Sequence, residues 1–77
     1  MKTRPEIPFI PWENYRNSAG VINLCKVFDY IVSESKVFIT EKEYKKKISY
    51  LKFIQSISSI HSSDSAAIAI ANCFYLL

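Results

Sequence analysis

The sequence predicts a small all-α fold, a single three-helix domain over residues 1–77 with a proline-rich extended N-terminal arm. Three observations carry this prediction. Apolar residues recur at the spacing of one helix face over much of the chain. Gly20 is the one glycine, whereas sheet proteins with many tight turns usually need several. The 77 residues suffice for one core and contain no internal repeat.

Residues 1–15 form the predicted arm, in which prolines stand at positions 5, 8 and 11. A spacing of three suits polyproline II geometry, and proline disfavours both a helix interior and an inner strand. We expect the apolar residues of the arm to act as a strap over exposed helix surface, on this subunit or on a second one. A weaker alternative is that Lys2, Pro5 and Pro8 form a basic-x-x-P-x-x-P pattern for an aromatic-lined groove.

The first helix is predicted over residues 17–33. At 100° per residue, one arc of this segment collects its apolar side chains, and Asn23, Lys26, Asp29 and Ser33 lie opposite. The apolar arc consists of Val21, Leu24, Cys25, Val27, Phe28, Ile31 and Val32.

The second helix is predicted over residues 40–60. Thr40 is a good N-cap and Glu43 completes a capping box, while Glu41 favours the first turn. After Lys47 this helix is apolar over more than half its circumference, and such a helix needs neighbours on several sides.

The third helix is predicted over residues 64–77, because four alanines favour a helix and the preceding His-Ser-Ser-Asp-Ser run supplies a loop and a cap. Alternation at Ile68 and Ile70 leaves a strand as the alternative.

Catalytic, metal and cofactor sites find no support in the residue types. His61 lies beside serines and Asp64, but a nucleophile, a base and an orienting group must converge in space rather than in sequence. Cys25 and Cys73 lack the paired spacing of a zinc site and are expected to be reduced, buried thiols.

With no signal peptide and no stretch of about 18 apolar residues, we expect a cytoplasmic protein without a membrane span. A membrane-surface role for residues 66–77 is a minor alternative.

Charge is concentrated in one segment. Residues 42–52 hold five lysines and one glutamate, a net charge of +4 in a chain whose total is +3. The candidate face for nucleic acid or an acidic partner is Lys42, Lys45, Lys46 and Lys52. Lysine and serine bind phosphates but read bases poorly, so a basic DNA-binding transcriptional regulator is the second hypothesis rather than the first.

Protein binding is the first hypothesis, because the apolar and aromatic content exceeds what a small domain buries within itself. The partner is a second copy, giving a homodimer, or another protein. A siteless chain of this size fits an inhibitor of a host protein encoded by a phage or mobile element, of the anti-CRISPR or immunity kind. The predicted partner-binding residues are Phe9, Ile10, Trp12, Tyr50, Phe53 and Ile57.

Overall fold

A computed structural model describes residues 9–76 and confirms the all-α class. Residues 1–8, and with them the Lys2–Pro5–Pro8 pattern, lie outside the described residues. The described elements are a 3₁₀ helix η1 at Trp12–Tyr15 and the helices α1 at Leu24–Glu34, α2 at Glu41–Ile57 and α3 at Ser63–Leu76.

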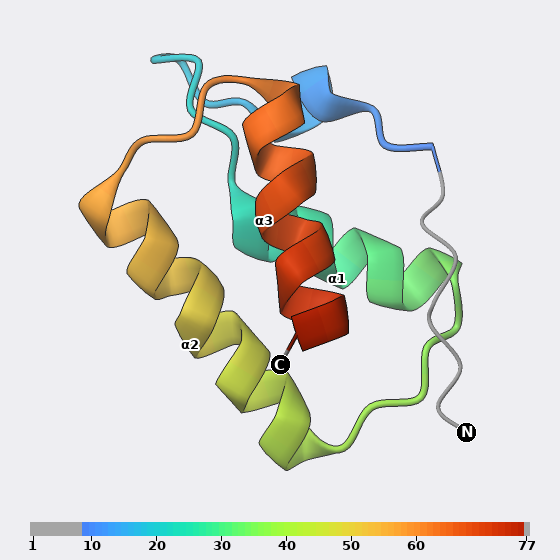
Figure 1. Cartoon of the computed structure of the whole chain (residues 1–77). Helices are drawn as coiled ribbons and strands as arrows, with labels where there is room; N and C mark the ends of the chain where they lie inside the picture. The colour runs from blue at the N-terminus through green and yellow to red at the C-terminus, as the bar shows by residue number, and fades with distance from the viewer. Residues whose placement is uncertain (1–8, 77) are drawn as a thin grey trace.

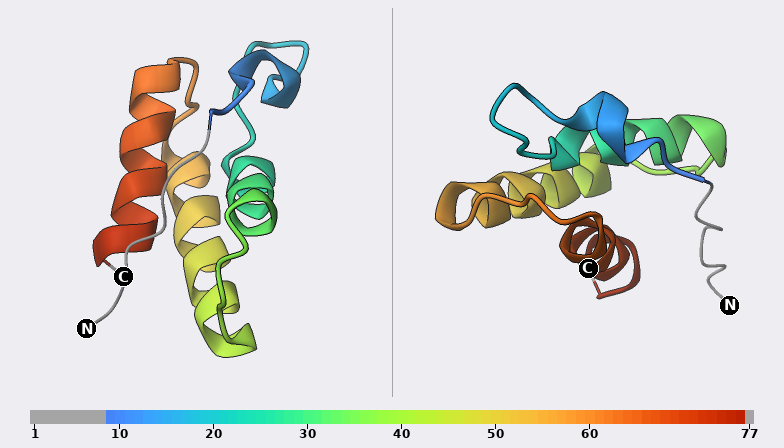
Figure 2. Two further views of the ribbon diagram at one scale, coloured as in Figure 1. Left: turned by 90° about the vertical axis from the view of Figure 1, so that its right-hand side faces the viewer. Right: turned by 90° about the horizontal axis from the view of Figure 1, so that it is seen from above.

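The three α-helices pack on one another around a shared core. Helices α2 and α3 run side by side in opposite directions, and α1 crosses behind α3 (Figure 1). In the left view of Figure 2 the η1 segment lies above α1, where it caps one end of the helix layer. The solvent side of α2 is therefore left uncovered by the other two helices.

The core draws on the linking segments as well as on the helices. Phe28 of α1 is fully buried, and its ring stacks on that of Phe74 from α3 with a centroid distance of 5.0 Å. Such aromatic pairs add to the burial of apolar area. The buried hydrophobic residues are Ile10, Ile22, Leu24, Val27, Phe28, Ile31, Leu51, Ile60, Ala66, Ala69, Ile70 and Cys73.

The predicted start of the first helix at residue 17 is wrong, because α1 begins at Leu24. The side chain of Asn17 accepts hydrogen bonds from two following amides, at 2.8 and 3.0 Å, and so competes with helix formation. Gly20 then takes a φ of +81°, which turns the chain out of a right-handed helix. Asn23 caps α1 instead, accepting a bond from the amide of Lys26.

The predicted extended arm does not reach residue 15, because Trp12–Tyr15 form the 3₁₀ helix η1. Pro11 precedes this helix, and its carbonyl accepts the amide of Asn14 at 2.9 Å. A proline with fixed φ is well suited to the first turn of a helix, so the third proline of the arm starts a turn rather than extending the arm.

The cap predicted for the second helix is confirmed. Thr40 accepts the amide of Glu43 at 3.2 Å, and its hydroxyl lies 3.1 Å from the carboxylate of the same residue. The helix ends at Ile57 and not at residue 60, because Ser58 is extended with φ −158°. This ending lets Ile60 return to the core, where its carbonyl accepts the amide of Ile22 at 2.8 Å.

The third segment is a helix and not a strand, starting one residue before the predicted position 64. Ser62 accepts the amide of Asp64 at 3.1 Å and so satisfies one of the free donors of the first turn. Asp64 itself lies in that turn, where a negative charge is favourable.

Candidate functional site

Three of the six residues predicted to bind a partner lie on α2, and two of them, Phe53 and Ile57, are exposed on its solvent side. Exposed residues stand at i, i+4, i+7, i+11 and i+15, a spacing that keeps side chains on one helix face. With a rise of 1.5 Å per residue, this row is about 22 Å long. We call it the α2 stripe, and it consists of Lys42, Lys46, Ser49, Phe53 and Ile57.

The C-terminal half of the stripe is apolar. The side chains of Phe53 and Ile57 are 60% and 65% exposed, although they are large hydrophobic residues. They stand one turn apart on the same helix, so they form one surface rather than two isolated contacts. Ordinary core packing does not account for these two residues.

Helix α3 carries another exposed apolar side chain, Ile68. Lys47 of α2 bonds to the main-chain oxygen of Cys73 on α3, and the two helices run in opposite directions. Phe53 is six residues after Lys47, and Ile68 is five residues before Cys73, so the two lie at about the same level. Ile68 is 62% exposed. In the sequence, Ile68 indicated only the alternative of a strand, through its alternation with Ile70.

Tyr50 lies on the edge of this surface rather than on the stripe. It follows Lys47 by three residues and so shares the flank of α2 that faces α3, where it is half-buried. Only the exposed part of the Tyr50 ring is available to contact a partner.

The four lysines of the predicted anion-binding face are all exposed. Lys42 and Lys46 belong to the stripe. Lys45 lies beside it and pairs with Glu41 at 3.3 Å, an exposed pair of little energetic consequence. Lys52 lies toward α1. Burial raises the pKa of the Cys25 thiol there, and the charge of Lys52 lowers it by a smaller amount. The structure therefore brings two of the four lysines into line with Phe53 and Ile57.

The described end of the arm packs on its own chain. Ile10 is only 5% exposed and belongs to the core, so it does not face a partner. Trp12 is half-buried against the same core. Phe9 remains 85% exposed, and its carbonyl accepts the hydroxyl of Tyr30 at 3.3 Å. Ile10 and Trp12 at the end of the arm therefore pack on the core of their own chain, while Phe9 does not.

An open apolar hollow of about 340 Å³ lies between the arm and the start of α3. Small-molecule sites combine apolar walls with a few converging polar groups, and here the polar residues are Glu13 and Ser63. The apolar part of the lining is Phe9, Ile10, Pro11 and Trp12.

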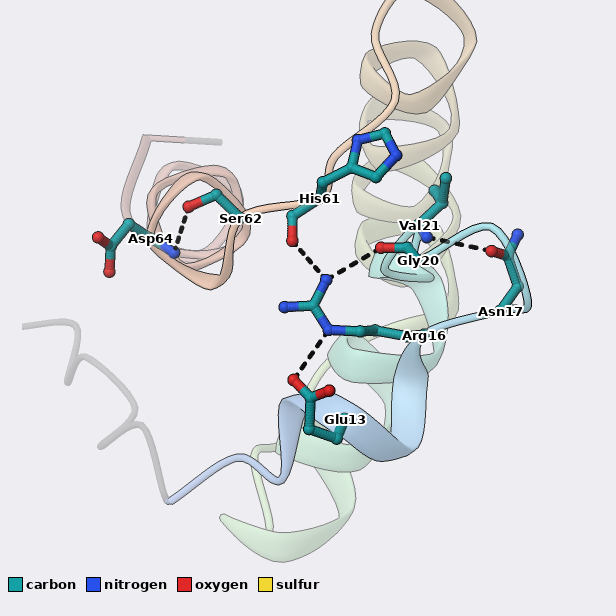
Figure 3. A network of polar contacts seen from close by, with 8 residues as sticks. All are labelled: Glu13, Arg16, Asn17, Gly20, Val21, His61, Ser62 and Asp64. Atoms are coloured by element: carbon teal, nitrogen blue, oxygen red, sulfur yellow. Dashed lines mark hydrogen bonds and ion pairs between the residues drawn. The ribbon is translucent and has the colours of Figure 1, made fainter.

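Arg16 holds the arm to the loop before α3, a role that the sequence did not reveal (Figure 3). Its guanidinium donates to the main-chain oxygens of Gly20, at 2.9 Å, and His61, and pairs with Glu13 at 2.9 Å. Arginine presents several donors in a fixed plane, so one side chain can join three segments. The one sequence feature that could have indicated this role is that position 16 is an arginine in a chain whose other basic residues are mostly lysine.

His61, Ser62 and Asp64 occupy the loop and cap positions expected from the sequence. The side chain of His61 is exposed, and its carbonyl serves Arg16 (Figure 3). Ser62 accepts the amide of Asp64. Within residues 9–76, no three histidine, cysteine or acidic side chains gather as a metal site would require.

Cys25 and Cys73 are free thiols. Burial raises the pKa of Cys73 to about 11, while the charge of Lys47 lowers it and Cys25 raises it, each by less than burial does. Burial also raises the pKa of Cys25. A reactive cysteine needs a lowered pKa and access to solvent, so neither thiol has the character of a nucleophile.

No protein-family model, curated protein or solved structure matches this chain. No relative therefore lends it an activity, a ligand or a partner. Over the part of the chain that the structure describes, none of the helices has the length and apolarity needed to traverse a bilayer.

Proposed function

We propose that this chain is a non-enzymatic protein-binding domain that uses the α2 stripe as its contact surface. The observation that carries the proposal is the exposure of Phe53 and Ile57, one turn apart on the side of α2 that no other helix covers. Contiguous exposed apolar residues mark interaction sites in soluble proteins, and aromatic residues dominate the binding energy of such sites.

A blocking role suits such a domain. It offers an exposed helical face and free thiols of raised pKa, and within its described residues no three histidine, cysteine or acidic side chains gather as a metal site would require. We propose that it is an inhibitor of a host protein, of phage or mobile-element origin, acting in the reducing cytoplasm, where free thiols persist. A homodimer through the same surface is the alternative use of Phe53 and Ile57.

Selection of peptides from a random displayed library tests the proposal without knowledge of the partner. The immobilised wild-type domain should enrich a family of peptides, and the double variant Phe53→Ser/Ile57→Ser should lose about ten-fold or more in affinity for them. The matched control is Phe38→Ser, because Phe38 is 92% exposed but lies between α1 and α2. Equal affinity in the wild type and the double variant would refute the assignment of the surface.

DNA binding is retained as a second candidate because Lys42, Lys45, Lys46 and Lys52 are all exposed on one helix. A generic duplex should then bind with an affinity that falls steeply as salt rises. The triple variant Lys45→Glu/Lys46→Glu/Lys52→Glu should no longer bind the duplex. Absence of salt-sensitive binding by the wild type removes this candidate.

A further inference from the structure

The α2 stripe changes its chemistry along its length. Its N-terminal part presents Lys42 and Lys46, and its C-terminal part presents Phe53 and Ile57, with Ser49 between them. We propose that the partner segment is an acidic amphipathic helix, whose apolar side chains cover Phe53 and Ile57 and whose carboxylates meet the two lysines. This inference rests on the proposed protein-binding function and specifies the chemistry of the partner.

The basic half is open to an external anion. Among residues 9–76, no carboxylate lies within ion-pair distance of Lys42 or Lys46, whereas Lys45 is paired with Glu41. After Glu43, the next acidic residue of the chain is Asp64 in α3. The positive charge of the stripe is therefore not balanced along α2, and a partner with carboxylates has a complementary charge.

The apolar half fits a helix in particular. Residues at i+11 and i+15 of the stripe, Phe53 and Ile57, form a ridge of the i±4 kind, and both are exposed. Ridges of this spacing pack into the grooves of a second helix. A stripe of about 22 Å spans about 15 residues of such a partner, which is an ordinary helix length.

Two other occupants satisfy these features less well. A second copy would bring the same uncompensated lysines and no carboxylate between Glu43 and Asp64. A nucleic acid duplex would satisfy the lysines but would leave Phe53 and Ile57 against phosphates and solvent. An acidic amphipathic helix matches both halves at once.

Three designed peptides of about 16 residues test the inference, with one common pattern of leucines at helical spacing and either glutamate, glutamine or lysine at the other positions. Binding to the wild-type domain is followed by fluorescence anisotropy at about 50 and about 300 mM salt. The glutamate peptide should bind about ten-fold tighter than the glutamine peptide, with an affinity that weakens as salt rises, and the lysine peptide should bind weakest.

Charge reversal provides the decisive variant. Lys42→Glu/Lys46→Glu should lose its preference for the glutamate peptide and bind the lysine peptide instead. Position 42 lies in the first turn of α2, where a negative charge is favourable, and circular dichroism checks that the double variant keeps its helical content. The matched control is Lys26→Glu/Lys36→Glu, which makes the same change of charge at exposed positions away from α2 and should keep the wild-type order of the peptides.

The outcomes separate the two proposals. Equal binding of the three peptides, or an unchanged preference after Lys42→Glu/Lys46→Glu, overturns the acidic partner but leaves the apolar contact surface standing. Peptide binding that survives Phe53→Ser/Ile57→Ser overturns both proposals. A duplex of about 20 base pairs that binds more tightly than the glutamate peptide also overturns the acidic helix in favour of nucleic acid.

Discussion

Lys47 on α2 donates a hydrogen bond from its Nζ to the main-chain oxygen of Cys73 on α3, across 3.1 Å. Cys73 lies in the last turn of α3, which ends at Leu76. The carbonyls of a last turn lack donors within the helix and carry the negative end of its dipole. Lys47 thus provides from α2 a cap for the C-terminus of α3, and only 6% of it is exposed.

Replacing Lys47 by methionine keeps an apolar side chain of similar length but should still destabilise the fold. Lys47→Met removes the donor and should lower the free energy of unfolding by about 1–3 kcal/mol. Urea unfolding followed by circular dichroism measures the change. The neighbouring exposed Lys46→Met is the control, with an expected change within about 0.5 kcal/mol. Equal effects of the two variants would show that the bond to Cys73 contributes nothing.

Gln55, like Lys47, is a side chain of α2 that hydrogen-bonds main-chain groups outside its own helix. Its amide accepts the N–H of Leu24 at 2.9 Å and donates to the carbonyl of Ile22 at 3.0 Å, so it joins α2 to the start of α1. Gln55→Leu leaves both main-chain groups without this partner and should cost about 1–3 kcal/mol. Amide hydrogen exchange at Leu24 should accelerate in the variant. Unchanged exchange there would contradict the role, and Ser49→Ala on the exposed face serves as the neutral comparison.

Arg16 should not be replaceable by lysine. One guanidinium nitrogen serves both Gly20 and His61, while Nε pairs with Glu13, and a single ammonium cannot reproduce this geometry (Figure 3). We expect Arg16→Lys to lower the thermal midpoint, with a cost of about 1–2 kcal/mol. Glu13 is 81% exposed, so Glu13→Gln should change stability by less than about 1 kcal/mol. A larger loss of stability in Glu13→Gln than in Arg16→Lys would mean that the ion pair, and not the main-chain contacts, holds the arm.

The buried thiol of Cys73 predicts a loss of stability at high pH. Its pKa of about 11 in the folded state exceeds the ordinary value of 9.0, so the unfolded chain loses this proton first as the pH rises. The stabilisation is complete below pH 9 and disappears between pH 9 and about pH 11.

Urea unfolding at about pH 8 and about pH 10.5 measures this effect, with Cys73→Ala as the comparison. The fall in unfolding free energy between the two pH values should be about 1–2 kcal/mol smaller in the variant. Tyrosines titrate in both proteins, so the difference between the two falls isolates the thiol. Identical falls would show that Cys73 ionises as readily in the fold as in the unfolded chain.

Local signals in the sequence predicted the helices well where caps and periodicity agreed. Thr40 with Glu43 marked the start of α2, and the repeat of Val27, Phe28 and Ile31 marked the buried face of α1. Asn17 and Gly20 were misjudged, because apolar periodicity continued through a segment whose side-chain and glycine chemistry favours a turn.

The candidate site was predicted only in part. Phe53 and Ile57 were recognised from the broad apolar circumference of α2, and they are exposed as a partner surface requires. Ile10 was assigned to the same set, but tertiary packing places it in the core. Ile68 was not singled out, although at 100° per residue it lies about 160° from Ile70 and so faces away from the buried side of α3.

Mapping the contact surface by NMR tests most directly the claim that the α2 stripe binds the partner. The ¹⁵N-labelled domain is titrated with the glutamate peptide, and amide shifts are followed over α2, α3 and the arm. We expect the largest changes along the α2 stripe from Lys42 to Ile57. Changes that cluster instead around Trp12 and the hollow at the start of α3 would contradict this claim.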